Sequence, residues 1–317
     1  MSLVPPRYAR GENRNAKGTS QLLEIPMKRT RVAVFRTTLL VLLVASFVRA
    51  QDNTVVNEPV EHIYAMPGGV ELKAYVFSPG KASARQRRPA IVLFHGGGWT
   101  VGEPQWAFPR AKHFAARGMV AVAAQYRLSD EKEITPLEAM ADARAVIRWM
   151  RTHADTLGID SGRIAAYGWS AGGHLAASAA IFDEGASGEN ISAAPNALVL
   201  VSPAVSLASD GWVQRLLGKR GAAQEISPDE HVRKGLPPTL ILQGSNDTVT
   251  PLSGAKRFCE RLRAAGNTCE LHVYEGFGHL FTPAGIPDDG MPKPDSTVSA
   301  DASARADRFL KSLGFLR

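Results

Sequence analysis

The stretch Gly168-Trp169-Ser170-Ala171-Gly172-Gly173 decides how this chain is interpreted. It follows a short apolar run, residues 163–167, and precedes an alanine-rich run, residues 174–180. A strand, a Gly-x-Ser-x-Gly turn and a helix in that order are typical of a nucleophile elbow. The turn strains the serine backbone and needs small neighbours, because strand and helix approach closely. We therefore expect an exposed Ser170 hydroxyl above the carboxyl end of a buried strand; the alternative is a glycine-rich turn with a capping serine.

A second glycine-rich turn, His95-Gly96-Gly97-Gly98-Trp99, ends an earlier apolar run. Glycines leave backbone N–H groups uncovered, so that a ligand atom can approach them closely. An acyl-transfer enzyme needs such donors for the oxygen that becomes negative in the tetrahedral intermediate. We expect an oxyanion hole made of the N–H groups of Gly97, Gly98 and Ala171. The alternative explanation of the glycine triplet is a tight turn at the end of a strand.

A serine nucleophile needs a base, and the base needs an acid that orients it. Asp247 and His279 follow two later strand-like runs, and the order serine, aspartate, histidine is that of α/β-hydrolases. Parallel sheets place their sites at the carboxyl ends of strands, so the three side chains are expected to meet there. Asp247 has an alternative role as a turn former or helix cap. His174 is the rival base, but it lies one helical turn beyond Ser170 and is expected to pack against the sheet, whereas His95 is expected to hold the oxyanion turn.

Apolar runs of strand length alternate with amphipathic runs of helix length between residues 60 and 313. This alternation predicts an α/β fold, with helices on both faces of a mostly parallel sheet. The first two runs, residues 60–66 and 70–77, are expected to form an antiparallel edge. One catalytic domain is expected over residues 51–317. Residues 206–238 form a sizeable insertion, expected to be a small cap whose apolar side chains dock on the core or line the site: Trp212, Val213, Leu216 and Leu217.

The net charge of +7 lies at the start of the 317-residue chain, because residues 1–50 carry nine Lys and Arg against two Glu. The rest is balanced, which argues against a nucleic-acid partner. Residues 27–50 combine a basic start with an uncharged run of 12 residues, 37–48, and a small residue at Ala50. This pattern predicts a signal peptide cleaved near Ala50 and export to the periplasm or beyond.

Residues 1–26 are polar and basic, and we interpret them as a gene-model extension ahead of a true start at Met27. An uncleaved anchor is the competing hypothesis for residues 27–50. The apolar run is short for a membrane span, so no stable membrane insertion is expected.

The two cysteines, Cys259 and Cys269, flank a turn between an amphipathic run and a strand-like run. A helix followed at once by its antiparallel strand can bring these positions within disulfide range. In an oxidising compartment we expect a bridge, and the alternative is a pair of buried free thiols. No Cys/His or paired-His spacing indicates a metal, and no Gly-rich phosphate loop precedes a lysine, so no cofactor is expected.

From about residue 60 onward the chain resembles α/β-hydrolase esterases. The stretch His95–Trp99 resembles that of hormone-sensitive-lipase-like carboxylesterases, which usually carry an acidic residue where this chain has Trp169. Gly-Trp-Ser-Ala-Gly-Gly-His is instead similar to bacterial acetyl-esterase, acetyl-xylan-esterase and feruloyl-esterase-like proteins. The resemblance implies hydrolysis through an acyl-enzyme on Ser170, with Asp247 and His279 completing the triad.

The expected substrate is a short-chain ester, either a small molecule or a polysaccharide. Only about a dozen residues are expected to precede the first strand after cleavage, so the cap is expected to be small and the site open. An open site suits a short acyl group on a bulky alcohol, such as an acetyl or feruloyl ester of a carbohydrate. Trp99 and Trp169 are expected to narrow the acyl pocket, with core packing as an equal alternative for Trp169. The alternative activities are those of a serine peptidase or an arylformamidase, and the alternative outside enzymes is a binding module.

Overall fold

The computed structural model describes residues 56, 58–80, 87–130, 133–183, 191–286 and 291–317. Gln51–Arg317 forms one compact unit. The signal peptide over residues 27–50 and the extension before it lie outside the described residues, so cleavage and export remain predictions. None of the helices in the described ranges combines the length and apolar character that crossing a membrane requires.

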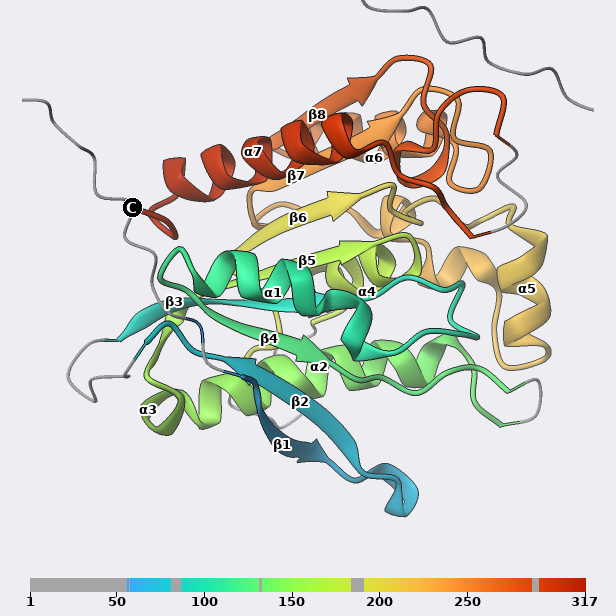
Figure 1. The fold of residues 1–317 in the computed structure, drawn as a ribbon. Helices are drawn as coiled ribbons and strands as arrows, with labels where there is room; N and C mark the ends of the chain where they lie inside the picture. The colour runs from blue at the N-terminus through green and yellow to red at the C-terminus, as the bar shows by residue number, and fades with distance from the viewer. Residues whose placement is uncertain (1–55, 57, 81–86, 131–132, 184–190, 287–290) are drawn as a thin grey trace, which may run out of the picture. The chain divides into compact units, whose positions relative to one another are not determined.

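Within the described residues, eight strands form one sheet in the order β1-β2-β4-β3-β5-β6-β7-β8 (Figure 1). Strand β2 pairs antiparallel with both β1 and β4, whereas every other neighbouring pair is parallel. The predicted mostly parallel sheet with an antiparallel N-terminal edge is therefore confirmed. The strands are β1 (Val60–Ala65), β2 (Leu72–Phe77), β3 (Arg88–Phe94), β4 (Val120–Ala124), β5 (Ile159–Trp169), β6 (Ala197–Val201), β7 (Thr239–Gly244) and β8 (Cys269–Tyr274).

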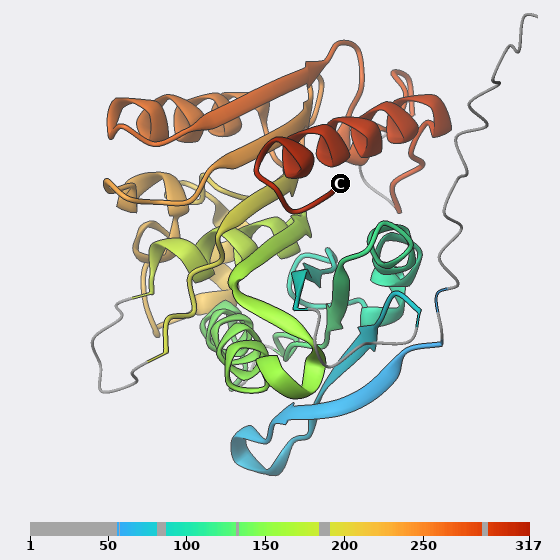
Figure 2. The same ribbon diagram turned by 90° about the vertical axis from the view of Figure 1, so that its left-hand side faces the viewer.

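Helices cover both faces of this sheet (Figure 2). Helices α1 (Phe108–Ala115) and α7 (Ser296–Ser312) pack on one face, in one hydrophobic cluster. The other face carries a second cluster with α2 (Pro136–Thr152), α4 (Ala171–Ile181) and α6 (Leu252–Ala264), and the short α3 (Ala154–Leu157) follows α2. Successive strand side chains point to opposite faces, so the central strands feed both clusters and are apolar throughout.

Helix α2 shows how local sequence sets the element boundaries. Thr135 accepts a hydrogen bond from the N–H of Leu137, and the Glu138 carboxylate accepts one from the N–H of Thr135. This capping box satisfies N–H groups that have no partner inside the helix, and Pro136 suits the first helical position. The helix therefore begins at Pro136.

The insertion at residues 206–238, here called the cap, contains helix α5 (Gly211–Leu217) and two 3₁₀ turns. Asp210 starts α5 by accepting hydrogen bonds from the N–H groups of Trp212 and Val213. The buried carboxylate of Asp229 binds Arg257 of α6 at 2.7 Å. This ion pair fixes the cap to the body of the domain.

Cys259 of α6 and Cys269 of β8 form a disulfide. The chain leaves α6, turns through Gly266 with φ of 80°, and returns in β8, which brings the two residues together. The predicted bridge is present, so neither cysteine is a free thiol.

Candidate active site

Ser170 lies in the turn between β5 and α4, with φ of 53° and ψ of −123°. Residues with a Cβ rarely adopt positive φ, so this backbone is strained. A Cβ on Gly168 would lie 2.1 Å from the carbonyl oxygen of Gly172, and one on Gly172 would lie 2.2 Å from that of Phe94. The turn thus has the geometry of the predicted elbow. Ser170 is only 9% exposed, less than expected, because neighbouring loops enclose it.

His279 lies between Ser170 and Asp247 and is within hydrogen-bond distance of both. Its Nε2 is 3.0 Å from Ser170 Oγ, and its Nδ1 is 3.0 Å and 3.1 Å from the two carboxylate oxygens of Asp247. The three residues follow β5, β7 and β8, whose carboxyl ends meet at one edge of the sheet. With Nδ1–H directed at the carboxylate, Nε2 can accept the serine proton.

Asp247 is buried and held by several donors besides the histidine. Its carboxylate accepts hydrogen bonds from the N–H of Val249 at 3.0 Å, from Thr250 N–H at 2.7 Å and Oγ1 at 2.9 Å, and from Gln243 Nε2 at 2.9 Å. Asp247 therefore closes its own turn, as the alternative interpretation proposed, and orients His279 as well.

The glycine turn after β3 presents backbone donors beside Ser170. Gly97 and Gly98 have φ of 116° and 58°, and a Cβ on Gly97 would lie 2.0 Å from the carbonyl oxygen of Val101. In the part of the chain that the structure describes, no backbone acceptor takes the N–H of Gly97, Gly98 or Ala171. Donors of this kind suit an oxygen that becomes negative during reaction. We call residues 95–99 the oxyanion loop.

His95 and Tyr126 hold the oxyanion loop through hydrogen bonds to its carbonyl oxygens. His95 Nδ1 is 2.6 Å from the carbonyl oxygen of Gly96, and the Tyr126 hydroxyl donates to the carbonyl oxygen of His95 at 2.9 Å. Burial lowers the pKa of His95 to about 4, so the ring is neutral and its Nδ1–H donates to Gly96. His95 supports the loop, as the sequence predicted.

His174, the rival base, lies away from the serine hydroxyl. Its Nε2 is 2.9 Å from the carbonyl oxygen of Ile226 in the cap, and its ring is fully buried. Burial lowers the pKa of His174 to about 4. These contacts agree with the expectation that His174 is not the base, although its hydrogen bond and its ring contact are with Ile226 of the cap and with Trp99, and not with the sheet.

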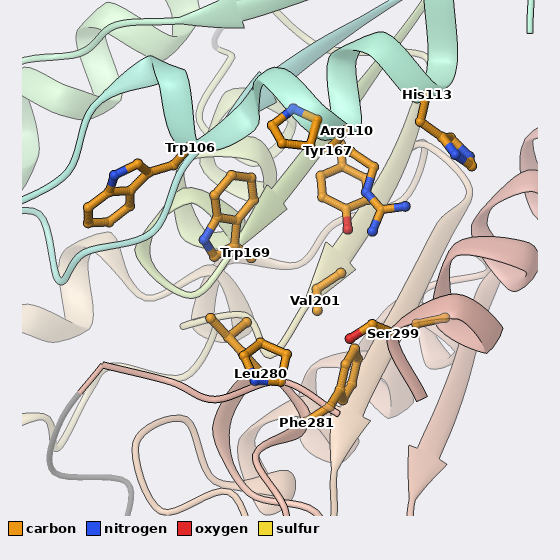
Figure 3. Close-up of a pocket in the computed structure, with 12 residues that line it drawn as sticks. Trp106, Arg110, His113, Tyr167, Trp169, Val201, Leu280, Phe281 and Ser299 are labelled. Atoms are coloured by element: carbon orange, nitrogen blue, oxygen red, sulfur yellow. The ribbon is translucent and has the colours of Figure 1, made fainter. Parts of the chain in front are cut away.

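The two tryptophans predicted to narrow the acyl pocket have different positions. Trp99 has φ of 64°, and this backbone turns its ring into the core, where it is 3% exposed and packs edge-on against His174 at 5.2 Å. The expectation that Trp99 lines the site is therefore wrong. Trp169 is partly exposed and lines a cavity of about 410 Å³ (Figure 3). Its ring also closes against Gly96, since a Cβ there would lie 2.9 Å from Trp169 Cδ1.

The four apolar side chains predicted in the cap divide between the two expected roles, docking on the core and lining the site. Val213, Leu216 and Leu217 are buried in the core, whereas Trp212 is 42% exposed. The indole Nε1 of Trp212 donates to the carbonyl oxygen of Gly98 at 3.3 Å. Trp212 thus lies at the oxyanion loop while its neighbours dock α5.

Several residues of the cavity were not predicted, among them Trp106, Arg110 and Phe281. Trp106 and Arg110 follow the oxyanion loop by fewer than 15 residues, and Phe281 lies two residues after His279. That proximity in sequence was the only available signal. Within the described ranges, no group of three or more His, Cys, Asp or Glu side chains is placed to hold a metal ion.

Comparison with known proteins gives one family and several relatives. Residues 91–283 match a family described as having the alpha/beta hydrolase fold. The chain is 27% identical over 215 residues to esterase LipC of Mycobacterium tuberculosis, which covers 61% of this chain and 53% of LipC. It is 29% identical over 196 residues to the probable carboxylic ester hydrolase LipM of the same organism, which covers 55% and 45% of the two chains. The chain spans about half the length of these curated relatives.

Solved structures give a fuller match. The apo form of Thermogutta terrifontis esterase 2 superposes with a TM-score of 0.73 and 37% sequence identity. The superposition covers 82% of this chain and 96% of that esterase. The similarity therefore extends over nearly the whole of the solved protein.

Proposed function

We propose that this chain, which belongs to the α/β-hydrolase family, is a serine carboxylesterase acting on short-chain acyl esters. The observation that carries the proposal is the continuous contact from Ser170 through His279 to Asp247, beside the donors of the oxyanion loop. A receptor or adhesion module of this fold has no use for such an arrangement. Peptidases and arylformamidases share the triad, but the relatives LipC and LipM are an esterase and a probable carboxylic ester hydrolase by name.

In the proposed mechanism, His279 removes the proton from Ser170 Oγ as the oxygen attacks the ester carbonyl. Asp247 keeps the imidazole in the tautomer that can accept this proton. The N–H groups of Gly97, Gly98 and Ala171 stabilise the oxyanion. His279 then protonates the leaving alcohol, and water activated by the same histidine releases the acid from Ser170.

A short acyl group suits the surroundings of the serine. Trp212 lies against Gly98, so a bulky ring flanks the oxyanion loop. Structures of Thermogutta terrifontis esterase 2 are described with propionate and with butyrate bound. We propose acetyl or feruloyl esters of carbohydrates as the substrates of this chain, with the small acetyl group favoured by the crowding.

The test is hydrolysis of 4-nitrophenyl esters from acetate to decanoate by the full chain and by its Ser170→Ala variant. We expect activity to fall with acyl length, and the variant to lose about 10⁴- to 10⁶-fold in kcat. Ser178→Ala is the matched control, since Ser178 is a buried serine on the same helix, α4. Undiminished hydrolysis by Ser170→Ala would rule out the nucleophile, and activity rising towards decanoate would rule out the short acyl group.

The alcohol is tested separately. Acetate release from acetylated xylan is measured beside hydrolysis of 4-nitrophenyl acetate, again with Ser170→Ala as the blank. Release from both supports a carbohydrate substrate. Hydrolysis of the aryl ester alone would reject acetylated xylan while retaining the carboxylesterase assignment.

A further inference from the structure

The cavity beside Trp169 is not lined by the triad or by the oxyanion loop, so neither of them explains its presence (Figure 3). It lies between α1 and α7, and we call it the α1–α7 cavity. Its wall includes Trp169, which precedes Ser170, and Leu280, which follows His279. The cavity is thus lined by the sequence neighbours of the proposed catalytic pair, and about 410 Å³ is in the range of small-molecule sites.

Aromatic rings dominate this wall. Trp106, which lines the cavity, is 39% exposed, so part of its ring is accessible to a ligand. In Figure 3, Trp169, Tyr167 and Arg110 lie across the cavity from Leu280 and Phe281. Aromatic faces are electron-rich and attract the hydrogen-bearing edges of another ring, aromatic or sugar. The walls therefore suit a ring-shaped group better than a flexible chain.

One positive charge reaches the cavity, that of Arg110 on α1. Its guanidinium lies 5.6 Å from the Tyr167 ring centroid and donates to Ser303 Oγ at 2.5 Å. The nearby Asp307 carboxylate pairs instead with His113 at 2.9 Å and Arg117 at 3.0 Å. Among the ion pairs of the described residues, none involves Arg110. A guanidinium fork that has an aromatic support and no carboxylate partner is suited to a carboxylate of the ligand.

The position of the cavity indicates which half of the ester it takes. His279 must give its proton to the leaving oxygen, so the alcohol lies on the side of His279. Leu280 and Phe281, the next two residues, line the α1–α7 cavity. Trp212, in contrast, crowds the oxyanion loop at Gly98. These contacts place the α1–α7 cavity on the alcohol side.

We propose that the α1–α7 cavity binds the alcohol half of the substrate, as a hydroxyl-bearing ring with a carboxylate. The ring lies against Trp106 and Trp169, and the carboxylate binds Arg110. Uronic acids and hydroxybenzoates share this chemistry, and the test distinguishes them. The assignment to the alcohol rests on the proposed esterase function, whereas carboxylate binding in the cavity does not.

Binding is measured by calorimetry on the full-chain Ser170→Ala variant, with two pairs of ligands. The pairs are 4-hydroxybenzoate with 4-hydroxybenzamide, and glucuronate with glucuronamide. In at least one pair we expect the carboxylate to bind about tenfold more tightly than the amide. The pair that shows the preference identifies the class of alcohol. Equal or absent binding of carboxylate and amide in both pairs would overturn the proposal.

Arg110→Gln, added to Ser170→Ala, should remove the preference for the carboxylate. Lys112→Gln is the matched control, because it removes the same charge from the same helix, at a side chain that pairs with Glu58. Trp106→Ala should weaken the binding of the carboxylate and of the amide equally. This variant keeps the proposal testable if Arg110→Gln does not fold. A carboxylate preference that survives Arg110→Gln would overturn the assignment.

Kinetics of the active chain then test the alcohol assignment with the acetyl esters of the pair that showed the preference, either 4-acetoxybenzoate against 4-acetoxybenzamide or acetylated glucuronate against acetylated glucuronamide. The ratio of their kcat/KM values should fall about tenfold in Arg110→Gln and stay unchanged in Lys112→Gln. A ratio unaffected by Arg110→Gln would reject the cavity as the alcohol site. Absence of hydrolysis in the parent chain, with carboxylate binding retained, would reject the esterase function and leave the binding site standing.

Discussion

The indole Nε1 of Trp212 donates a hydrogen bond to the carbonyl oxygen of Gly98, at 3.3 Å, so the cap is joined directly to the oxyanion loop. The guanidinium of Arg215 lies over the Trp212 ring, 5.4 Å from its centroid. Three buried apolar side chains of α5 fix the helix that carries both residues. An insertion that would be expected only to cover the substrate is thus placed to hold the backbone donors to which the proposed mechanism assigns stabilisation of the transition state.

Trp212→Phe tests this arrangement, because it keeps a ring and removes the donor. We expect kcat to fall about two- to tenfold with KM nearly unchanged, since a hydrogen bond of this kind contributes roughly 0.5–1.5 kcal/mol. Gln214→Ala is the control, because Gln214 bonds only within the cap, to Gly221 and Ala223. A rise in KM at constant kcat would show that Trp212 binds substrate and does not position the loop.

Asp247→Asn tests the orientation of His279. The amide retains an oxygen that can accept the hydrogen bonds of Val249 and Thr250, so we expect the fold to survive. Its NH₂ group, however, can hold His279 in the wrong tautomer, and kcat should fall by about 10⁴-fold. The measurements are ester hydrolysis and a thermal melt of the same preparation. Activity within tenfold of the parent would exclude Asp247 as the orienting acid.

The proposed catalytic residues could be placed from sequence because their signals are local. Each of Ser170, Asp247 and His279 follows a strand, and a parallel sheet brings the ends of its strands together. The prediction for Trp99 was wrong because it depended on a backbone conformation that the sequence does not indicate. Its φ of 64° is uncommon for a non-glycine residue, and this turn directs the ring into the core.

The α1–α7 cavity could not have been derived in this way. Arg110, which lines the cavity, and its hydrogen-bond partner Ser303 are separated by 193 residues. No periodicity or spacing relates them, because only the packing of α1 and α7 on the same face of the sheet brings them together. Helix α5, in contrast, could have been predicted from the sequence, because Asp210 before it and Gly218 after it are ordinary helix start and stop signals.

The buried histidines His95 and His174 predict a loss of stability in acid. Burial lowers both pKa values to about 4, from about 6.5 in the unfolded chain. Between these values the unfolded state binds protons that the folded state does not, so stability falls as the pH decreases from about 6.5 to about 4. Each histidine contributes a slope of about 1.4 kcal/mol per pH unit in this window and none above it.

His174→Gln isolates one of these contributions, since glutamine can still donate to the carbonyl oxygen of Ile226. The free energy of unfolding is measured in urea from pH 4 to 7.5. The variant should show a slope smaller by about 1.4 kcal/mol per pH unit. His153→Gln, at an exposed position, is the control. Equal slopes in the parent and in His174→Gln would contradict the lowered pKa.

The disulfide between Cys259 and Cys269 is expected to stabilise the fold without affecting the chemistry. The bridge closes a loop over a sequence separation of 10, which corresponds to roughly 3 kcal/mol of unfolding free energy in the chain-entropy account. Cys269 begins β8, whereas His279 follows the opposite end of that strand, so turnover by the folded protein should be unchanged. Urea unfolding with and without reductant measures the first effect, and ester hydrolysis under the same two conditions measures the second.

The double variant Cys259→Ala with Cys269→Ala should match the reduced protein within the small difference that two lost sulfur atoms make in the core. Thiol titration of the denatured parent should find no reactive sulfur before reduction and both afterwards; two reactive thiols without reductant would show that the bridge does not form.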